Sequence, residues 1–504
     1  MRTMKLTLLA AALFAAQQST AAVPVDTEAF RAAITPQGVR AHQYELQSIA
    51  DTNGGTRAAS TPGHEASLEY IKLLVESAGY VVTVQPFDFP YFQEQSPAQL
   101  EQLAPVPTVY PYAEASGFFT MTYSGAGEIT GAAEGVDLQL PPAATANSST
   151  SGCEPEDFAG FTPGKIAIIQ RGSCTFLLKA QNAEAAGASG VVIFNEGQAG
   201  RTDAFNGTLG EPSVGIPVVG AAFAVGEELA AGDVMARVFV DAISEIRNTS
   251  NLIAETQGGR DDRVVVVGAH LDSVQEGPGI NDNGSGSAAL LEMALRLAEM
   301  GFEPVNQVRF AWWGAEEVGL LGSQAYVDNL SARDIKDIAV NLNFDMIGSP
   351  NFARFVYDGD GSATDIAGPN GSGNIEQVFL DYFADQSLPV EPTAFDGRTD
   401  YGPFIAVGIP AGGLFTGAEG IKTVEQEAIY GGIAGEPYDP CYHLACDTYD
   451  NNNDEALDQM SDAAAHAVFT FAMTSSSVNG TDKGSDKAQK SADALDYQGS
   501  KLRR

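Results

Sequence analysis

Basic side chains are scarce in this sequence relative to acidic ones. Only 27 lysines and arginines stand against 65 aspartates and glutamates, so the formal net charge is -38. A chain this acidic is repelled by nucleic-acid backbones and by anionic membrane surfaces, and neither is expected as a partner. The same acidity favours solubility and tolerance of salt, which accounts for the larger part of it.

Long apolar stretches are missing after the first residues, so no membrane span is expected. Residues 1–22 begin with Arg2 and Lys5, continue in the apolar run Leu6–Ala16, and end in small residues. That run is too short to cross a bilayer, and the pattern predicts a cleavable secretory signal peptide. We therefore expect a secreted protein, either extracellular or periplasmic.

Cysteine is rare, and its four copies show no CxxC spacing, which argues against a cysteine-ligated metal site. Export to an oxidising compartment makes two disulfides the expectation instead. Three pairings of four cysteines exist. The bonds between sequence neighbours are favoured, namely Cys153 with Cys174 and Cys441 with Cys446.

The length of 504 residues favours two or three structural units. Helical spacing over Val39–Val75, interrupted by a loop at Asp51–Pro62, predicts two helices. Val81–Val84 predicts a strand, and Pro86–Tyr112, without clear periodicity, is expected to be a connection. Residues 116–246, rich in Gly, Ala and Val, predict a small domain inserted between residues 23–115 and 247–475 of a larger one.

Strand and helix patterns alternate from residue 247, which predicts an α/β fold with a mixed, mostly parallel sheet between layers of helices. Residues 476–504 contain almost no apolar side chains. They cannot bury a core, so a disordered tail is expected there.

Ionisable residues follow three predicted strands of this sheet. They are His270 after Val264–Val267, Glu316 and Glu317 after Gln307–Trp313, and Asp345 after Val340–Phe344. Ligands of open α/β sheets bind at the carboxyl ends of the strands, so these side chains are expected to meet there. The glycine-rich loop Gly279–Gly286 can bring Asp282 to the same edge.

Histidine is also rare, with five copies in the chain. His443 lies between Cys441 and Cys446, in a loop that the expected disulfide holds stiff, as a metal-ligand position requires. His42, His64 and His466 lie in helical patterns and are interpreted as surface or packing residues.

Each of these ionisable residues alone is most simply a helix cap or a solvated side chain. As a set they predict a metal site. Two imidazoles with three or four carboxylates suit zinc, which accepts nitrogen and oxygen ligands, better than calcium or magnesium, which prefer oxygen.

Two family resemblances are carried by longer motifs. The segments GKIAIIQRGSCTF, KAQNAEAAGASGVVIFN and, later, IPVV resemble the protease-associated (PA) domain, a non-catalytic insert that shields the active site or selects substrates in several peptidase families. The segments AHLDS, NDNGSGSAALLEMA, FAWWGAEEVGLLGSQAYV, NFDMIGSPN, GRTDYGPF and CYHLACD resemble, in this order, the secreted bacterial di-zinc aminopeptidases of the leucyl aminopeptidase type. RAASTPGHEASLEYIKLLVESAGY matches their N-terminal region, so the resemblance covers nearly the whole chain apart from the signal, the insert and the tail.

The second resemblance implies the zinc exopeptidase fold and two zinc ions per chain. By position, Asp282 would bridge the two ions, His270 and Asp345 would complete one site, and Glu317 and His443 would complete the other. Glu316, left without a metal, would be the general base, because such sites need a carboxylate to take the proton of the attacking water.

Three further roles are implied by position. Tyr442 would donate a hydrogen bond to the developing oxyanion, and Asp272 would orient the His270 ring. Arg398 matches a position near the substrate, although a structural ion pair is an equal interpretation. The expected substrates are peptides with a free N-terminus, with leucine or another large apolar residue first, and the expected state is a monomer.

Two other activities and a binding role occur on the same fold. Carboxypeptidases of the glutamate-releasing type would need a basic cluster for the terminal carboxylate, and none is evident here. Receptor ectodomains that have lost catalysis have no reason to keep the whole ligand set. Glutaminyl cyclases are disfavoured by the complete second-metal set.

Overall fold

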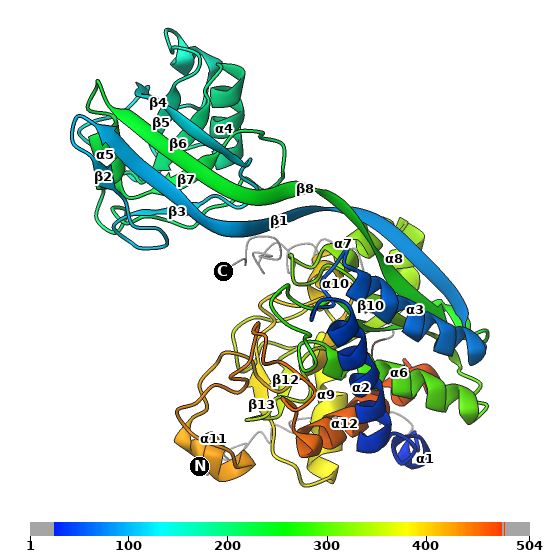
Figure 1. The fold of residues 1–504 in the computed structure, drawn as a ribbon. Helices are drawn as coiled ribbons and strands as arrows, with labels where there is room; N and C mark the ends of the chain where they lie inside the picture. The colour runs from blue at the N-terminus through cyan, green and yellow to red at the C-terminus, as the bar shows by residue number, and fades with distance from the viewer. Residues whose placement is uncertain (1–24, 476–477, 479–504) are drawn as a thin grey trace, which may run out of the picture.

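Two lobes joined by a pair of long strands make up the chain (Figure 1). The computed structural model describes residues 25–475 and Val478. The expected signal peptide, residues 1–22, and the expected tail, residues 476–504, therefore lie outside the described residues except for Val478. No helix among the described residues has the length and apolar character needed to cross a membrane.

The larger lobe is built on a mixed, mostly parallel sheet. Its strand order is β13 (Glu391–Thr393), β12 (Phe355–Tyr357), β14 (Ala411–Phe415), β11 (Ile338–Phe344), β9 (Arg260–His270), β10 (Asn306–Trp313) and the end of β8 (Met235–Glu255). β14, β11, β9 and β10 run parallel. The neighbours at the two sides reverse direction, because β8 is antiparallel to β10 and β12 is antiparallel to β14.

Helices cover both faces of this sheet. One face carries α1 (Glu28–Arg31), α2 (Pro36–Thr52), α3 (Pro62–Ser77), α6 (Gly284–Glu299), α9 (Ser372–Asp385) and α12 (Asp454–Met473). The other face carries α7 (Leu321–Asp328), α8 (Ala332–Asp337) and α10 (Tyr401–Ala406), while α11 (Val424–Tyr430) belongs to the connection after β14. The predicted fold class is confirmed.

The position of β9 in the middle of the sheet explains why its sequence is a continuous valine run. Val265 and Val267 pack into the core beneath α6 and α12, whereas Val264 and Val266 pack into the core beneath α7 and α10. Because side chains alternate between the faces of a strand, only a strand buried on both faces needs every position apolar.

The smaller lobe is carried by the far halves of β1 (Val81–Ala104) and β8, which pair antiparallel from Val81 opposite Glu255 to Ala104 opposite Met235. Beyond β8 the sheet continues through β4 (Gly127–Val136), β5 (Ile166–Gln170), β6 (Gly190–Phe194), β7 (Val218–Ala221) and β3 (Phe118–Thr120). The short strand β2 (Thr108–Val109) pairs with β1. A 3₁₀ turn (Pro155–Phe158), α4 (Phe176–Ala185) and α5 (Phe223–Leu229) complete this lobe.

The expectation of a connection at Pro86–Tyr112 is wrong, because β1 runs unbroken to Ala104. Pro86 and Pro90 obscure the strand pattern in the sequence, although in the structure Phe89 and Tyr91 are buried and alternate with more exposed neighbours. Proline is tolerated there because this part of β1 pairs on one side only, with β8, so one edge makes no ladder hydrogen bonds.

Other local expectations are confirmed. α2 ends at Thr52 and α3 begins at Pro62, where the Thr61 side chain accepts a hydrogen bond from the His64 backbone. The disulfides join Cys153 to Cys174 and Cys441 to Cys446, as favoured from the sequence.

Replacing His466 by glutamine should reduce the loss of stability in acid. In the folded protein, His466 Nδ1 lies 2.9 Å from Thr27 Oγ1. Burial, with Arg31 nearby, lowers the pKa of His466 to about 4. The unfolded chain takes up this proton at about pH 6.5, so acid favours unfolding. Wild-type stability should therefore fall, relative to His466→Gln, as the pH decreases from about 6.5 to about 4.

Urea unfolding midpoints of both proteins across this range measure the effect. Groups other than His466 affect both proteins alike and cancel in the comparison. Parallel curves for the two proteins would contradict the burial of a neutral His466.

Candidate active site

The strand-end residues and Asp282 meet at one edge of the larger sheet. His270 ends β9, and its Nε2 atom lies 3.2 Å from Asp282 Oδ1 and 3.2 Å from Asp345 Oδ1. Glu316 follows β10, and its Oε2 atom lies farther from the same nitrogen, at 3.9 Å. Asp282 immediately precedes Asn283, which caps α6.

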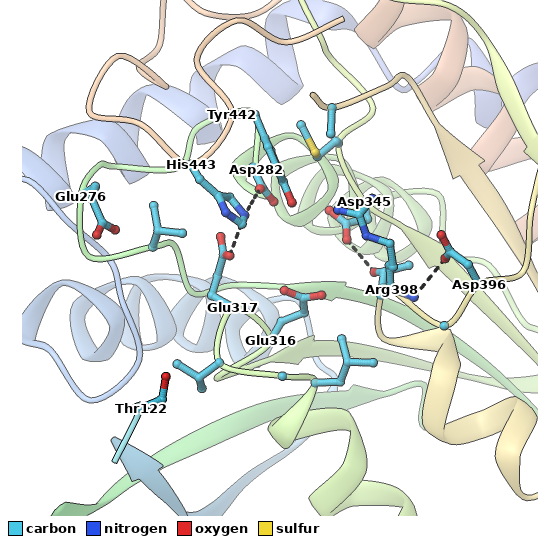
Figure 2. A pocket seen from close by; sticks show the side chains of 18 of the residues that line it. Thr122, Glu276, Asp282, Glu316, Glu317, Asp345, Asp396, Arg398, Tyr442 and His443 are labelled. Carbon is cyan, nitrogen blue, oxygen red and sulfur yellow. Dashed lines mark hydrogen bonds and ion pairs between the residues drawn. The ribbon is translucent and has the colours of Figure 1, made fainter. Parts of the chain in front are cut away.

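His443 approaches this edge from the disulfide-closed loop. Its Nε2 atom lies 3.0 Å from Glu317 Oε2 and 3.3 Å from Asp282 Oδ2 (Figure 2). The two oxygens of the Asp282 carboxylate therefore face two different imidazoles. The environments differ, because the His270 side chain is 1% exposed and that of His443 is 42% exposed.

Burial and mutual repulsion shift the acids of this edge. Burial and the carboxylates of Asp345 and Asp400 raise the pKa of Glu316 well above its usual range. Burial and Asp282 raise the pKa of Glu317 to about 7. At Asp282 burial opposes ionisation, but the hydrogen bonds with the two imidazoles outweigh it and lower the pKa. Glu316 and Glu317 are thus hard to ionise, whereas Asp282, between the two imidazoles, ionises readily.

The donor set fits a divalent metal. Two groups of ligand atoms each lie within 4.8 Å of one another, one from His270, Glu316 and Asp345 and one from His270, Asp282 and Glu317. Glu317 Oε1 is buried and has no hydrogen-bond partner among the described residues. Mixed imidazole and carboxylate donors are the ligands of zinc rather than of calcium.

Arg57 holds the backbone of the loops that carry the site residues, a role that the sequence did not predict. It is fully buried, and its guanidinium donates to the backbone carbonyls of Leu271, Pro278 and Gly279. Burial lowers the pKa of Arg57 to about 10, against the attraction of nearby carboxylates, so the group stays charged at neutral pH. One cation thus fixes the loop after β9 and the loop that carries Asp282.

Asp447 was missed as well. Its carboxylate accepts hydrogen bonds from the backbone amides of Asn281 and Asp282, both at 2.9 Å. Asp439 accepts from the Asn281 side chain at 2.7 Å. The loop that presents His443 is thereby tied to the loop that presents Asp282. An acid directly after Cys446 was the available signal, but nothing in the sequence shows which backbone groups it faces.

Asp272 supports the site by a route that differs from the expected one. Its backbone carbonyl lies 3.1 Å from His270 Nδ1, while its carboxylate is 3.8 Å away. That carboxylate accepts hydrogen bonds from the amides of Glu316 and Glu317, at 3.1 and 3.3 Å. Asp272 therefore positions the ends of two strands at once.

Backbone strain is concentrated beside the same residues. Ala315, Met346 and His443 have φ values of 57°, 53° and 57°, in the left-handed region that residues other than glycine rarely adopt. Ala315 precedes Glu316, and Met346 follows Asp345. Such conformations cost on the order of 1–3 kcal/mol each and persist only where the surrounding structure imposes them.

The site opens into a cavity of about 670 Å³ that Tyr442, Arg398 and Glu316 help to line. The ring of Tyr442 stacks on that of His443, with centroids 3.8 Å apart. Arg398 lies 3.2 Å from Glu419 and borders the cavity, so the ion-pair and the substrate-side interpretations describe the same side chain.

Comparison with known sequences identifies the family. Residues 251–468 match peptidase family M28, and residues 138–229 match the PA domain. An aminopeptidase of Pseudomonas aeruginosa is 49% identical over 438 residues, covering 86% of this chain and 80% of that protein. The chain belongs to peptidase family M28. The predicted family and the inserted PA domain are thereby confirmed.

Other similar proteins are aminopeptidases as well. Leucine aminopeptidase 2 of Trichophyton equinum is 47% identical over 330 residues, covering 64% of this chain and 66% of that protein. Among solved structures, an aminopeptidase from Aneurinibacillus sp. strain AM-1 superposes with a TM-score of 0.62 and 27% identity, over 88% of this chain and 95% of that one. A zinc aminopeptidase from Bacillus subtilis gives a TM-score of 0.54 and 26% identity, over 86% and 95%.

Arg57→Met should destabilise this M28 chain strongly, because it leaves the buried carbonyls of Leu271 and Pro278 without donors, takes one of two donors from that of Gly279, and removes a buried cation from among acids. We expect a loss of about 3–5 kcal/mol in unfolding free energy, the usual effect of removing one partner from a buried charge network. Arg57→Lys keeps the charge but lacks the planar fork of donors, so its unfolding free energy should lie between those of the wild type and Arg57→Met.

Urea unfolding measures these changes, with Arg333→Met as the matched control, since the Arg333 side chain is 74% exposed. Equal midpoints for Arg57→Met and Arg333→Met would contradict the bracing role.

Proposed function

We propose that this protein is a zinc-dependent aminopeptidase that releases single residues from the free N-terminus of peptides. The observation that carries the proposal is the Asp282 carboxylate, whose two oxygens face His270 and His443. Each imidazole also has a second carboxylate beside it, Asp345 or Glu317. The aminopeptidases among its relatives support the activity, and the Bacillus subtilis enzyme supports zinc.

Two zinc ions account for this arrangement. Asp282 would be shared between them, with His270 and Asp345 completing one set and Glu317 and His443 the other. When bound, a pair of zinc ions lowers the pKa of a water between them and polarises the scissile carbonyl. Glu317 Oε1 is buried and has no hydrogen-bond partner among the described residues, so in this assignment it is available as a metal ligand.

Glu316 is the residue left to move the proton. Its carboxylate is the most distant of the three that face His270, which favours a base over a ligand. It takes a proton from the attacking water and returns it to the departing amino group. Asp272 holds the Glu316 backbone amide during these transfers. Burial and neighbouring carboxylates raise the pKa of Tyr442, so it stays protonated and can donate to the oxyanion.

The cavity favours an amino end and an apolar first side chain. Beyond Asp345 it is lined by Met346, Tyr357 and Phe415, which suit leucine or another large apolar residue. Carboxylates far outnumber basic side chains along its wall. A substrate's ammonium group is therefore attracted and a terminal carboxylate repelled, which disfavours a carboxypeptidase.

Two further expectations remain part of this proposal. Export is supported by the two disulfides, which persist in oxidising compartments. We assign residues 116–246 to the inserted domain and residues 23–115 and 247–475 to the catalytic one, acting as a monomer; the far half of β1, up to Ala104, and β2 nevertheless extend into the smaller lobe.

The purified protein should contain about two zinc ions per chain, and His443→Ala about one, because it removes one terminal ligand and leaves the shared carboxylate. His443 lies on an exposed loop, so the fold should survive. Elemental analysis with thermal unfolding measures both. His466→Gln, far from the ligand set, is the matched control and should retain both ions. One ion in the wild type, or global unfolding of His443→Ala, would contradict this assignment.

Glu316→Gln should separate chemistry from metal binding. An amide cannot act as a base, so kcat should fall by a factor on the order of 10² to 10⁴ while zinc content and KM change far less. Glu317→Gln should instead weaken zinc binding, because an amide is a poorer ligand, and added zinc should restore part of the activity. Steady-state kinetics with elemental analysis distinguishes the two. If Glu316→Gln lost zinc and Glu317→Gln kept it, the two roles would have to be exchanged.

A further inference from the structure

The active-site cavity continues onto the smaller lobe. One side of it is formed by Asp282, Glu317 and Asp345. Another is formed by the inserted lobe, which here means the inserted domain together with the preceding segment from the far half of β1 to Tyr112; its lining residues include Phe92, Glu94, Tyr112, Phe119, Thr122 and Asn206. Figure 2 shows Thr122 on the same side of the site as Glu276 and Glu317, away from Asp396. A bound peptide therefore meets the inserted lobe within the same cavity.

Glu94 is the one charged side chain that the inserted lobe contributes among the described residues lining this cavity. It stands on β1 where the pairing with β8 becomes irregular, between Glu94 and Ser96, and such bulges re-aim a side chain. Thr120 Oγ1 donates to one carboxylate oxygen at 2.6 Å, and the Tyr112 hydroxyl donates to the other. Burial and this hydrogen bond raise the pKa of Tyr112 to about 12, so it remains a donor at neutral pH.

The two hydroxyls hold Glu94 in place without neutralising it. No basic side chain of the described residues forms a salt bridge with its carboxylate. Glu276, an exposed residue on a loop of the larger lobe, adds a second carboxylate to the cavity lining beside the partly exposed Glu94. The basic side chains of the lining, Arg398 and His443, already face carboxylates of their own.

The direction of the peptide follows from the proposed function, on which this inference rests. On that proposal the first side chain lies against Tyr357 and Phe415, which belong to the apolar part of the lining. The residues after the scissile bond then extend toward Val274, Glu276 and the inserted lobe.

We propose that the smaller lobe, formed by the PA domain and the far half of β1, is the binding surface for the residues that follow the scissile bond, and that Glu94 of β1 selects a basic side chain there over an acidic one. Attraction of lysine or arginine and repulsion of aspartate act together at a fixed, unpaired carboxylate. Peptides with an acidic residue or a free terminal carboxylate close to the scissile bond are poor substrates for the same reason.

The test compares amidated peptides of the form Leu-Ala-Ala-Ala in which lysine or aspartate replaces each alanine in turn. In the wild type, kcat/KM should favour lysine over aspartate by about fivefold or more at one of these positions, the scale of a partly exposed ion pair. Glu94→Gln, which removes the charge and keeps an acceptor oxygen for one of the two hydroxyls, should abolish this ratio, and Glu94→Lys should reverse it. The matched control is Glu114→Gln, an equal charge change on an exposed residue of the same lobe that does not line the cavity.

The outcomes are separable from those of the proposed function. Cleavage of leucyl p-nitroanilide by the wild type reports the aminopeptidase activity alone, since this substrate has no residue after the scissile bond. A wild type that cleaves it but treats lysine and aspartate peptides equally would overturn the role of Glu94. A preference that persists in Glu94→Gln, or disappears equally in Glu114→Gln, would overturn it as well.

Discussion

Crowding of carboxylates at one buried edge of the sheet is the constraint on which the rest of the site depends. Charges a few ångströms apart repel strongly where water is scarce, so each acid there needs a compensating partner. The two imidazoles lie between the acids, and Arg57 lies beneath them. Asp272 and Asp447 are occupied by backbone amides. The carboxylates left without a cationic partner are potential cation ligands.

The same supports explain how loops from distant parts of the chain reach a common geometry. Arg57 comes from the segment between α2 and α3, and Asp447 from the loop after the second disulfide, yet both bind the backbone around Asp282. Strained residues next to Glu316, Asp345 and at His443 persist because these contacts leave the backbone no alternative. Stability and reactivity at this edge are therefore properties of one hydrogen-bonded unit.

The sequence predicted the parts of this architecture that leave a periodic or compositional signal. Valines buried on both faces marked β9, and the scarcity of histidine singled out His270 and His443. Arg57 could not be found in this way, because a buried cation among backbone carbonyls has no spacing that distinguishes it from a surface arginine. β1 was misjudged since its prolines conceal an alternation that only pairing with β8 makes visible. Asp272 was placed correctly at the edge, but the atoms that it uses depend on the fold.

The long pairing of β1 with β8 has a consequence for how this chain tolerates insertions and deletions. Successive side chains of a strand point to opposite faces, so removing one residue from β1 ahead of Glu94 would turn every later side chain to the other face. Removal of two residues from β1 together with two from the paired part of β8 would keep the facing but draw the smaller lobe inward by about 7 Å, given a rise of about 3.4 Å per residue. The length of the β1–β8 ribbon in residues therefore fixes the distance between the carboxylate-rich edge of the larger sheet and the smaller lobe.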